Sequence, residues 1–123
     1  MRGKFSFRPH ERMHRPAEFQ HVKKAGKRAK TPHFGLNFIP NHLEHHRLGL
    51  IVQKRFWCAA KRNRIKRVVR EWFRLEKSRI PMPARDFVVI ARPGAEKLSP
   101  ADVSAEFRPV LDTAVVNRQD GST

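Results

Sequence analysis

The sequence of 123 residues is short of several features, and each shortage excludes a class of protein. Cys58 is its only cysteine, so the chain cannot form an internal disulfide, which is typical of a reducing compartment. The longest apolar runs, 48–52 and 87–91, are far shorter than the roughly 20 residues that span a bilayer. The charged segment 1–13 lacks the apolar stretch of a secretion signal. These absences predict a cytoplasmic protein.

Side chains that could carry out catalysis or bind a metal are also scarce. Acidic residues number 11, and two that share a predicted helix, Glu71 and Glu76, are five positions apart and so do not face each other. The histidine-rich segment 42–46 has no neighbouring cysteines and makes a poor tetrahedral zinc site. The sequence also has no glycine-rich loop for a phosphate. We therefore expect no catalytic residue, no metal ligand and no tightly bound cofactor in this chain.

What the chain has instead is a large excess of positive charge. Its 27 Lys and Arg residues against 11 Asp and Glu give a net charge of +16 and a pI near 11.5. Residues 1–30 contain ten basic and two acidic residues, and residues 54–79 contain eleven basic and two acidic residues. From residue 93 onward, three basic residues stand against five acidic ones. Because a monomer with this charge repels itself, the pattern indicates a protein with a basic face that binds a polyanion.

Length and hydrophobic pattern predict one α/β domain over residues 1–123, a sheet covered by helices, with 1–14 and 117–123 loosely ordered. The first helix should begin at Pro16 and end at Gly26. The next predicted elements are an irregular strand or loop at 26–32, strands at 33–39 and 47–53, a long helix at about 58–77, a strand at 86–92 and a helix that begins near Ser99. The strand 86–92 is apolar throughout and should be central. Pro109 should kink or split the last helix.

The segment KRNRIKRVVREWFR, 61–74, combines seven basic residues with one acid and five large apolar residues. An α-helix advances about 100° per residue, which brings the apolar residues within roughly 80° of Ile65. This stripe, typical of a helix that packs on a core, consists of Ile65, Val68, Val69, Trp72 and Phe73. The opposite side of the helix carries a basic ridge of Asn63, Arg67, Arg70 and Arg74. Arg64 and Lys66 lie on either side of this ridge.

The basic ridge has two interpretations, a solvated helix face or a phosphate-binding surface. Glu71 is the only acid in 61–74, so ion pairs along the helix cannot offset the crowding of arginines. Arginines outnumber lysines five to two there, and the planar guanidinium suits phosphate. The pattern therefore favours the phosphate-binding surface. Asn63 could read a base edge or a ribose hydroxyl, or it could be an ordinary polar residue of a first helical turn.

These residues resemble the protein subunit of bacterial ribonuclease P. The resemblance rests on Lys54-Arg55, the spacer FWCAAK and the segment RNRIKRVVREWFR from Arg62 to Arg74. The flanking segments RLGL (47–50), DFVVIARP (86–93) and EFQHVKKAGK (18–27) are also similar to the family, so the likeness covers residues 11 to 116. It implies an α+β two-layer sandwich with a mixed sheet of four strands in the order α-β-β-β-α-β-α. It also implies a left-handed crossover through the basic helix, where the general rule predicts a right-handed one.

The resemblance also implies a function. In this family the RNA subunit carries the catalysis and, with Mg²⁺ bound mainly by the RNA, removes the 5′ leader of precursor tRNA. The protein binds the catalytic RNA and holds the leader in a cleft between the first helix and the sheet, so neither DNA nor a membrane is an expected partner. Carried over by motif, the RNA-contacting residues are Arg62, Asn63, Arg64, Lys66, Arg67 and Arg70, preceded by Lys54 and Arg55 and followed on the ridge by Arg74.

The leader cleft of the family includes an aromatic residue, which Phe19 matches. Phe19 could stack on a base or pack in the core beside Val22. The sequence also departs from the family, with Lys23 where some members have a second aromatic, Asn37 where some have tyrosine, and Trp57 where glycine is common. These departures predict a cleft that relies less on stacking and more on charge, with Lys23 beside Phe19 among the RNA-binding residues.

Three other functions compete with this hypothesis. Another small basic RNA-binding protein, ribosomal or an RNA chaperone, would share the charge and the basic helix. A reader of the DNA major groove usually places its helix after a short helix and a tight turn, whereas this helix follows a strand. Binding to a membrane surface would need the apolar stripe that the core requires.

Overall fold

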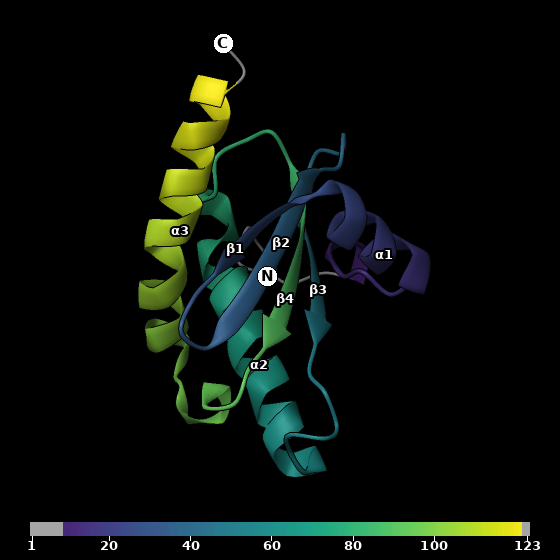
Figure 1. Ribbon diagram of the computed structural model, residues 1–123, viewed down its shortest axis with the longest axis vertical. Helices are drawn as coiled ribbons and strands as arrows, with labels where there is room; N and C mark the ends of the chain where they lie inside the picture. Colours follow the sequence, from purple (N-terminus) through teal and green to yellow (C-terminus); the bar gives the residue numbers. More distant parts are fainter. Residues whose placement is uncertain (1–8, 122–123) are drawn as a thin grey trace, which may run out of the picture.

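The computed structural model describes residues 9–121, and it describes side chains as far as Asp112 (Figure 1). Its main elements are α1 (Pro16–Ala25), β1 (Lys27–Lys30), β2 (Phe34–Pro40), β3 (Arg47–Ile51), α2 (Ala59–Glu76), β4 (Arg85–Ala91) and α3 (Pro100–Gly121). Short 3-10 helices, η1, η2 and η3, lie at Pro9–Glu11, Lys77–Arg79 and Ala95–Lys97. The order of helices and strands is the one expected from the resemblance.

The four strands form one mixed sheet in the order β1-β2-β4-β3. Strand β2 pairs antiparallel with β1 and β4, whereas β3 pairs parallel with β4. Helix α2 makes the connection between the two parallel strands. In Figure 1, β3 and β4 run down the page, β4 lies to the left of β3, and α2 returns behind the sheet. That arrangement is a left-handed crossover.

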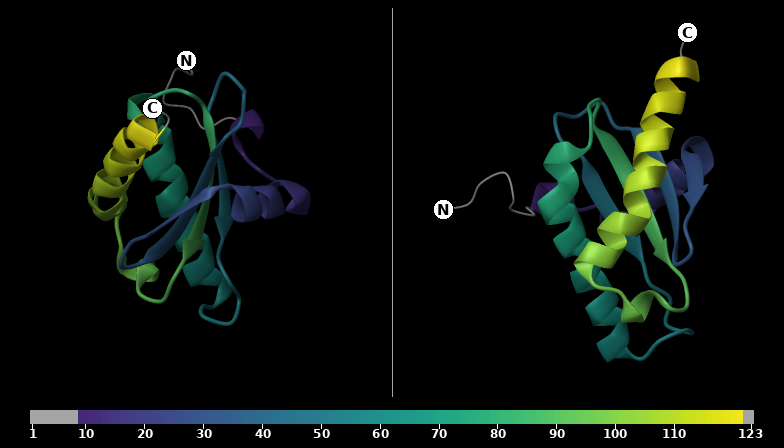
Figure 2. Two further views of the ribbon diagram at one scale, coloured as in Figure 1. Left: turned by 45° about the horizontal axis from the view of Figure 1, so that its top comes forward. Right: turned by 90° about the vertical axis from the view of Figure 1, so that its left-hand side faces the viewer.

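Strand β4 is central, as its apolar sequence predicts, and it separates two clusters of apolar side chains. Phe87 and Val89 belong to the large cluster under α2 and α3, and Val88 belongs to a smaller cluster with α1. Figure 2 shows the sheet between α2 on one side and α1 on the other. The two-layer arrangement therefore has a partial third layer, because α1 covers part of the second face.

Helix α2 packs its apolar stripe on the sheet and on α3, as the periodicity predicts. Ile65, Val68, Val69, Trp72 and Phe73 are all buried. The ring of Trp72 meets the ring of Phe107 from α3 edge-on, with 4.7 Å between centroids. The basic ridge consequently points away from the core. Within the described residues no helix has the length and hydrophobicity to cross a membrane.

The segment before α1 is not loosely ordered over residues 9–14, contrary to expectation. Met13 is buried, and its N–H donates to the carbonyl of Leu48 at 3.0 Å. Glu11 is buried and pairs with Lys77 at 2.6 Å. The physical reason is that β3 is an edge strand, so its outer backbone groups are open to pairing. Residues 1–8 and 122–123, also expected to be loosely ordered, lie outside the described residues.

Two further expectations need revision at β1 and α3. The segment 26–32, expected to be an irregular strand or loop, contains a regular strand at Lys27–Lys30 that pairs with β2. Helix α3 runs through Pro109 without splitting and extends to Gly121, while the loose order expected at 117–123 stays a prediction. Pro109 removes the hydrogen bond to the carbonyl of Ala105, but both residues are exposed, so water can satisfy that carbonyl.

Trp72 should be structural although it lies on the helix that carries the basic ridge. We expect Trp72→Ala to leave a cavity beside Phe107 and to lower the free energy of unfolding by about 3–5 kcal/mol. Urea denaturation followed by circular dichroism measures this change. Arg67→Ala is the matched control, since Arg67 is exposed on the opposite side of α2 and should unfold like the wild type. A Trp72→Ala protein with wild-type stability would mean that the helix faces are assigned wrongly.

Candidate nucleic-acid interface

The basic ridge of α2 presents unpaired polar and cationic groups to solvent. Asn63 and Arg67 are exposed and Lys66 is half-buried. Among the residues that the structure describes, the side chains of these three make no hydrogen bond or ion pair. Their donors are therefore available to an anionic ligand, and the asparagine amide can also accept a hydrogen bond. Whether they contact RNA stays a prediction.

Two arginines at the start of α2 have structural contacts that the sequence did not predict. Arg64 donates from Nε to the carbonyl of Glu96 at 3.0 Å and from Nη2 to the carbonyl of Leu98 at 3.1 Å. Arg62 donates to the carbonyl of Trp57 at 3.4 Å and is half-buried. These bonds tie α2 to η3 and to the turn before the helix. Arg64 thus helps to hold the ridge in place, and it remains exposed for a further contact.

The far part of the ridge differs in its surroundings. Burial lowers the pKa of Arg70, and the nearby charge of Arg12 adds to the effect. An arginine stays charged in proteins, so an anion bound there would relieve this repulsion. Arg74 instead pairs with Glu71, with 2.6 Å between Nη2 and Oε2, and this hydrogen bond raises the pKa of Arg74 and lowers that of Glu71. Arg74 is therefore partly neutralised, unlike the other ridge cations.

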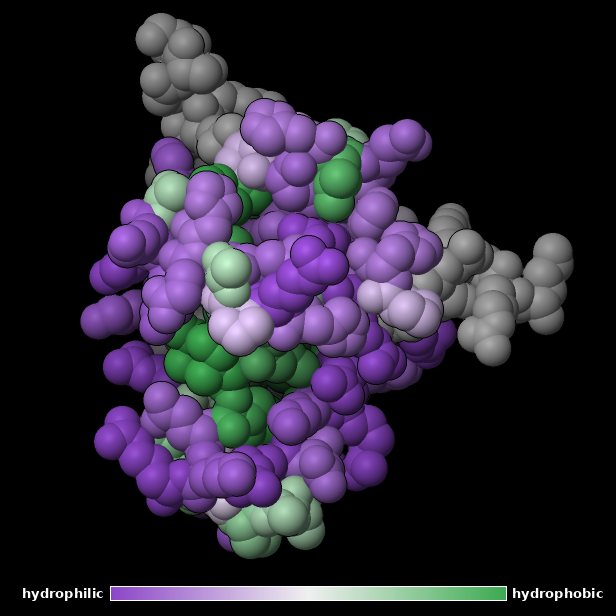
Figure 3. All heavy atoms as spheres, turned by 90° about the vertical axis from the view of Figure 1, so that its right-hand side faces the viewer, coloured by the Kyte–Doolittle hydropathy of each residue, from purple (hydrophilic) through white to green (hydrophobic). Residues whose placement is uncertain are grey.

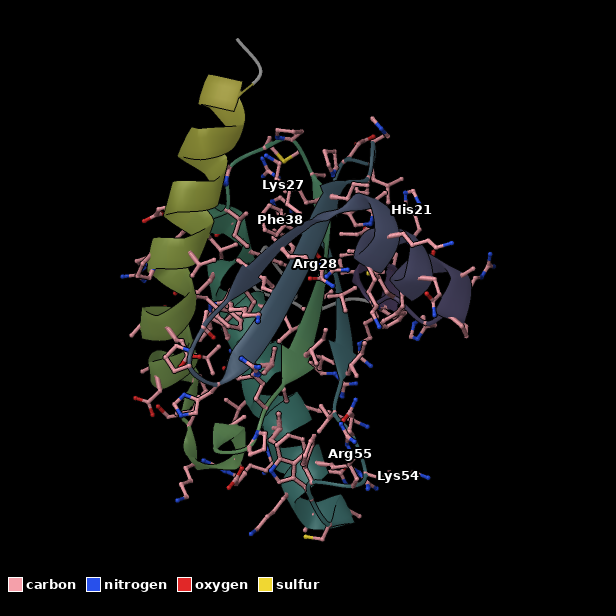
Figure 4. All side chains as sticks on the ribbon, in the orientation of Figure 1. His21, Lys27, Arg28, Phe38, Lys54 and Arg55 are labelled. Atoms are coloured by element: carbon pink, nitrogen blue, oxygen red, sulfur yellow. The ribbon has the colours of Figure 1, made fainter. Side chains whose placement is uncertain are left out.

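Lys54 and Arg55 lie in the exposed turn between β3 and α2, and Figure 4 shows them side by side near the start of the helix. Lys54 makes no ion pair with any described residue, while Arg55 donates from Nε to the side-chain oxygen of Gln53 at 3.0 Å. The turn thus extends the positive surface of α2 beyond its first residue.

A second basic surface lies on the other face of the sheet, beside α1. It is a groove of about 290 Å³ whose lining consists of Lys23, Arg28, Ala29, Lys30, Gly35, Asn37, Ile90 and Arg92. The lining includes four cations and no acid. In the β1–β2 register Arg28 is opposite Asn37 and Lys30 is opposite Gly35, so alternate residues of both strands face this groove.

Phe19 lies on the same face of the sheet as the groove, but it packs on the protein. A Cβ added to Gly49 would be 2.6 Å from Cζ of Phe19, so glycine lets the ring lie directly on β3. The ring joins the small apolar cluster with Val22 and Val88 and remains half-buried. Core packing is thus part of its role, and stacking on RNA stays a prediction. Figure 3 shows the α1 side of the molecule as mostly hydrophilic, with a large apolar area near its centre and smaller ones above and below it.

Of the four cations in the groove, the sequence predicts Lys23 as a site residue but not Arg28, Lys30 or Arg92. The alternation of β1 could have revealed Arg28 and Lys30, had 27–30 been assigned as a strand.

The turn after β1 is fixed to α3, because Glu106 accepts hydrogen bonds from Thr31 and, at 2.8 Å, from the backbone N–H of His33. Burial raises the pKa of Glu106, but these hydrogen bonds outweigh it and lower the pKa overall.

The described acidic residues are largely engaged in holding the fold. Arg47 binds both Glu18, at 2.9 Å, and Asp86, at 2.6 Å, and so links α1, β3 and β4. Glu96 accepts from the indole N–H of Trp57 at 2.7 Å, which lowers the pKa of Glu96. No group of three or more metal-ligating side chains occurs within the described residues. The interface therefore offers cations, amides and aromatic rings rather than carboxylates.

Comparisons with known proteins place the chain in a family. A family model described as Ribonuclease P matches residues 7–115. The ribonuclease P protein component of Syntrophobacter fumaroxidans is 62% identical over 111 residues, 90% of this chain and 93% of that protein. The ribonuclease P protein component of Haemophilus influenzae is 45% identical over 110 residues, which are 89% of this chain and 87% of that protein.

Solved structures show the same fold. The chain is similar to the RNase P protein of Staphylococcus aureus, with a TM-score of 0.74 and 34% identity over 85% of this chain and 94% of the other. It is also similar to the RNase P protein of Thermotoga maritima, with a TM-score of 0.72 and 32% identity over 82% of this chain and 94% of the other.

Arg67→Gln should weaken binding to a structured RNA without affecting the fold, since this exposed side chain has no partner in the protein. Each lost phosphate contact should reduce the slope of log K against log salt by about 0.7–0.9. Filter binding at several salt concentrations measures the slope. Arg108→Gln is the matched control, because it removes the same charge from an exposed position on α3. Equal losses in both variants would mean that net charge alone, and not the ridge, sets the affinity.

Proposed function

Because the chain belongs to the ribonuclease P protein family, whose members are protein components of a tRNA-processing endoribonuclease with an RNA partner, we propose that it binds two RNA segments. One is the catalytic RNA of the holoenzyme, and the other is the 5′ leader of precursor tRNA. The protein thereby assists the Mg²⁺-dependent hydrolysis that removes the leader and leaves the mature 5′ end. This activity belongs in the cytoplasm.

The observation that carries the proposal is the presence of two basic surfaces on opposite faces of one sheet. The basic ridge lies on the outer side of α2, whose apolar stripe faces the core. The groove lies on the other face, beside α1. A single RNA segment cannot easily cover both surfaces at once, so the arrangement favours two segments. The burial of the apolar stripe also argues for RNA over a membrane as the partner.

The shapes of the two surfaces favour a division of roles. The ridge is convex and exposed, which suits the phosphate backbone of a folded RNA such as the catalytic subunit. The groove is concave, with Lys23 from α1, Arg28 from β1 and Arg92 after β4 along its lining. It suits a single strand, whose phosphates the cations would bind. The side-chain amide of Asn37 in the groove can donate to and accept from a base or a ribose hydroxyl.

The catalytic step belongs to the RNA in this proposal, and so does Mg²⁺. A protein site for the metal would need several free oxygen ligands close together. The described carboxylates do not fit that requirement, because Glu18 and Asp86 are bound to Arg47 and Glu106 to Thr31 and His33. The chain's own contribution is to bind, to orient the leader and to reduce the repulsion between two RNA segments.

Reconstitution tests the function. The purified protein is combined with a bacterial ribonuclease P RNA and a precursor tRNA at low Mg²⁺, where the protein should increase leader removal. The protein without RNA should cut nothing. No increase by the wild-type protein, or leader removal by the protein without RNA, would contradict the proposal.

Substitutions in the groove should weaken the binding only of substrates that carry a leader. We expect the double variant Lys23→Gln/Arg28→Gln to weaken holoenzyme binding to precursor tRNA by about 0.4–2 kcal/mol, the sum of two exposed ion pairs. Binding of mature tRNA should not change. The matched control is Lys24→Gln/Lys27→Gln, which removes two charges from the same helix and strand at positions outside the groove (Figure 4 labels Lys27 and Arg28). Equal weakening by the two double variants would show that the groove does not hold the leader.

A further inference from the structure

The turn before α2 exposes a large aromatic ring that the core does not use. Phe56 is 42% exposed and belongs to neither apolar cluster. The other large apolar residues exposed among those described, Leu43, Leu75 and Met82, are not aromatic. A phenyl ring with this much exposed surface stabilises the fold less than a core ring does, so its exposed face is available to a ligand.

The ring of Phe56 is part of an ordered stack. The guanidinium of Arg55 lies over it, 4.7 Å from its centroid, and the ring of Trp57 meets it edge-on at 5.5 Å. Arg55 is itself held by Gln53, whose side-chain oxygen accepts from Nε at 3.0 Å. The arginine and the phenyl ring therefore form a flat pair, which we call the Arg55–Phe56 platform.

The platform is anchored to the body of the protein by Trp57. That indole is buried, and it donates to Glu96 at 2.7 Å. Glu96 also accepts from the backbone N–H of Gly94 at 3.0 Å, and Arg64 binds the Glu96 carbonyl. The turn is thus fixed between α2 and η3 before any ligand arrives. A ligand that stacks there needs little ordering of the protein, which favours binding.

The surroundings of the platform identify the class of ligand. Lys54 and Lys61 lie on either side of it in the sequence, are exposed, and have no ion pair with the described residues. A flat ring with an arginine over it and exposed lysines in the same turn and at the start of α2 fits a group that is flat and carries a negative charge nearby. An unpaired nucleobase with its phosphate has both features.

We propose that the Arg55–Phe56 platform stacks on an unpaired base of the RNA that binds α2. The proposal rests on the proposed function, because it takes RNA as the partner of the ridge, and it adds an aromatic contact to a surface otherwise made of cations. The base lies on the exposed face of the pair, and Lys54 and Lys61 bind the neighbouring phosphates. The RNA segment must therefore be single-stranded or bulged at this point.

The test uses the full-length protein and a bacterial ribonuclease P RNA at fixed salt. Phe56→Ala should weaken binding about 5- to 150-fold, which corresponds to the 1–3 kcal/mol of one stacked base. Phe56→Leu should lose as much, because leucine is apolar but has no ring face. Phe56→Tyr should retain the wild-type affinity. None of the three should shift the melting temperature, since the side chain lies outside the core.

The salt dependence separates this contact from those of the ridge. Phe56→Ala should leave the slope of log K against log salt unchanged, whereas Arg67→Gln should reduce it. Wild-type affinity in Phe56→Ala, or in Phe56→Leu, would overturn the platform while leaving the proposed function intact. A wild-type protein that neither binds the RNA nor stimulates cleavage would overturn the proposed function itself.

Discussion

Strand β4 is buried on both faces, and the separation of the two basic surfaces depends on it. Phe87 and Val89 pack against α2 and α3, while Val88 packs against α1 on the other side. Because successive side chains of a strand point to opposite faces, one apolar strand can support two independent layers. The parallel pairing of β3 with β4 then places α2 entirely on one face of the sheet. The groove beside α1 is left on the other face.

Acidic and basic side chains have different roles in this protein. The described acids mostly bind partners that hold elements together, and few remain to neutralise the surface. The main pairs are Glu11 with Lys77, Glu18 and Asp86 with Arg47, Glu71 with Arg74, Glu76 with Arg108, and Glu106 with His33. The excess of cations is therefore not spread evenly. It remains on the ridge, in the turn before α2 and in the groove, where a polyanion can bind it.

The sequence predicts those features of the fold that depend on local periodicity. The long helix, expected at about 58–77, is Ala59–Glu76, and its five apolar residues are all buried. Strand β1 is too short and polar to show a clear period and is defined by its pairing with β2, whereas the docking of residues 9–13 depends on backbone pairing with the distant strand β3. The groove was missed for the same reason. Its cations come from α1, β1 and the end of β4, and only the register of the sheet brings them together.

Arg64 shows why a motif alone does not fix the role of each of its residues. It lies one position before Ile65, about 100° from the centre of the apolar stripe, at the border between buried and exposed sides of the helix. A long side chain at that border can reach a neighbouring element, and Arg64 reaches the carbonyls of Glu96 and Leu98. Trp57 reaches the Glu96 side chain from the preceding turn. The end of the turn and the first part of α2 are thereby both attached to the segment around η3. The cations of the turn and of the ridge are therefore held on a rigid support, which lowers the ordering cost of binding a partner.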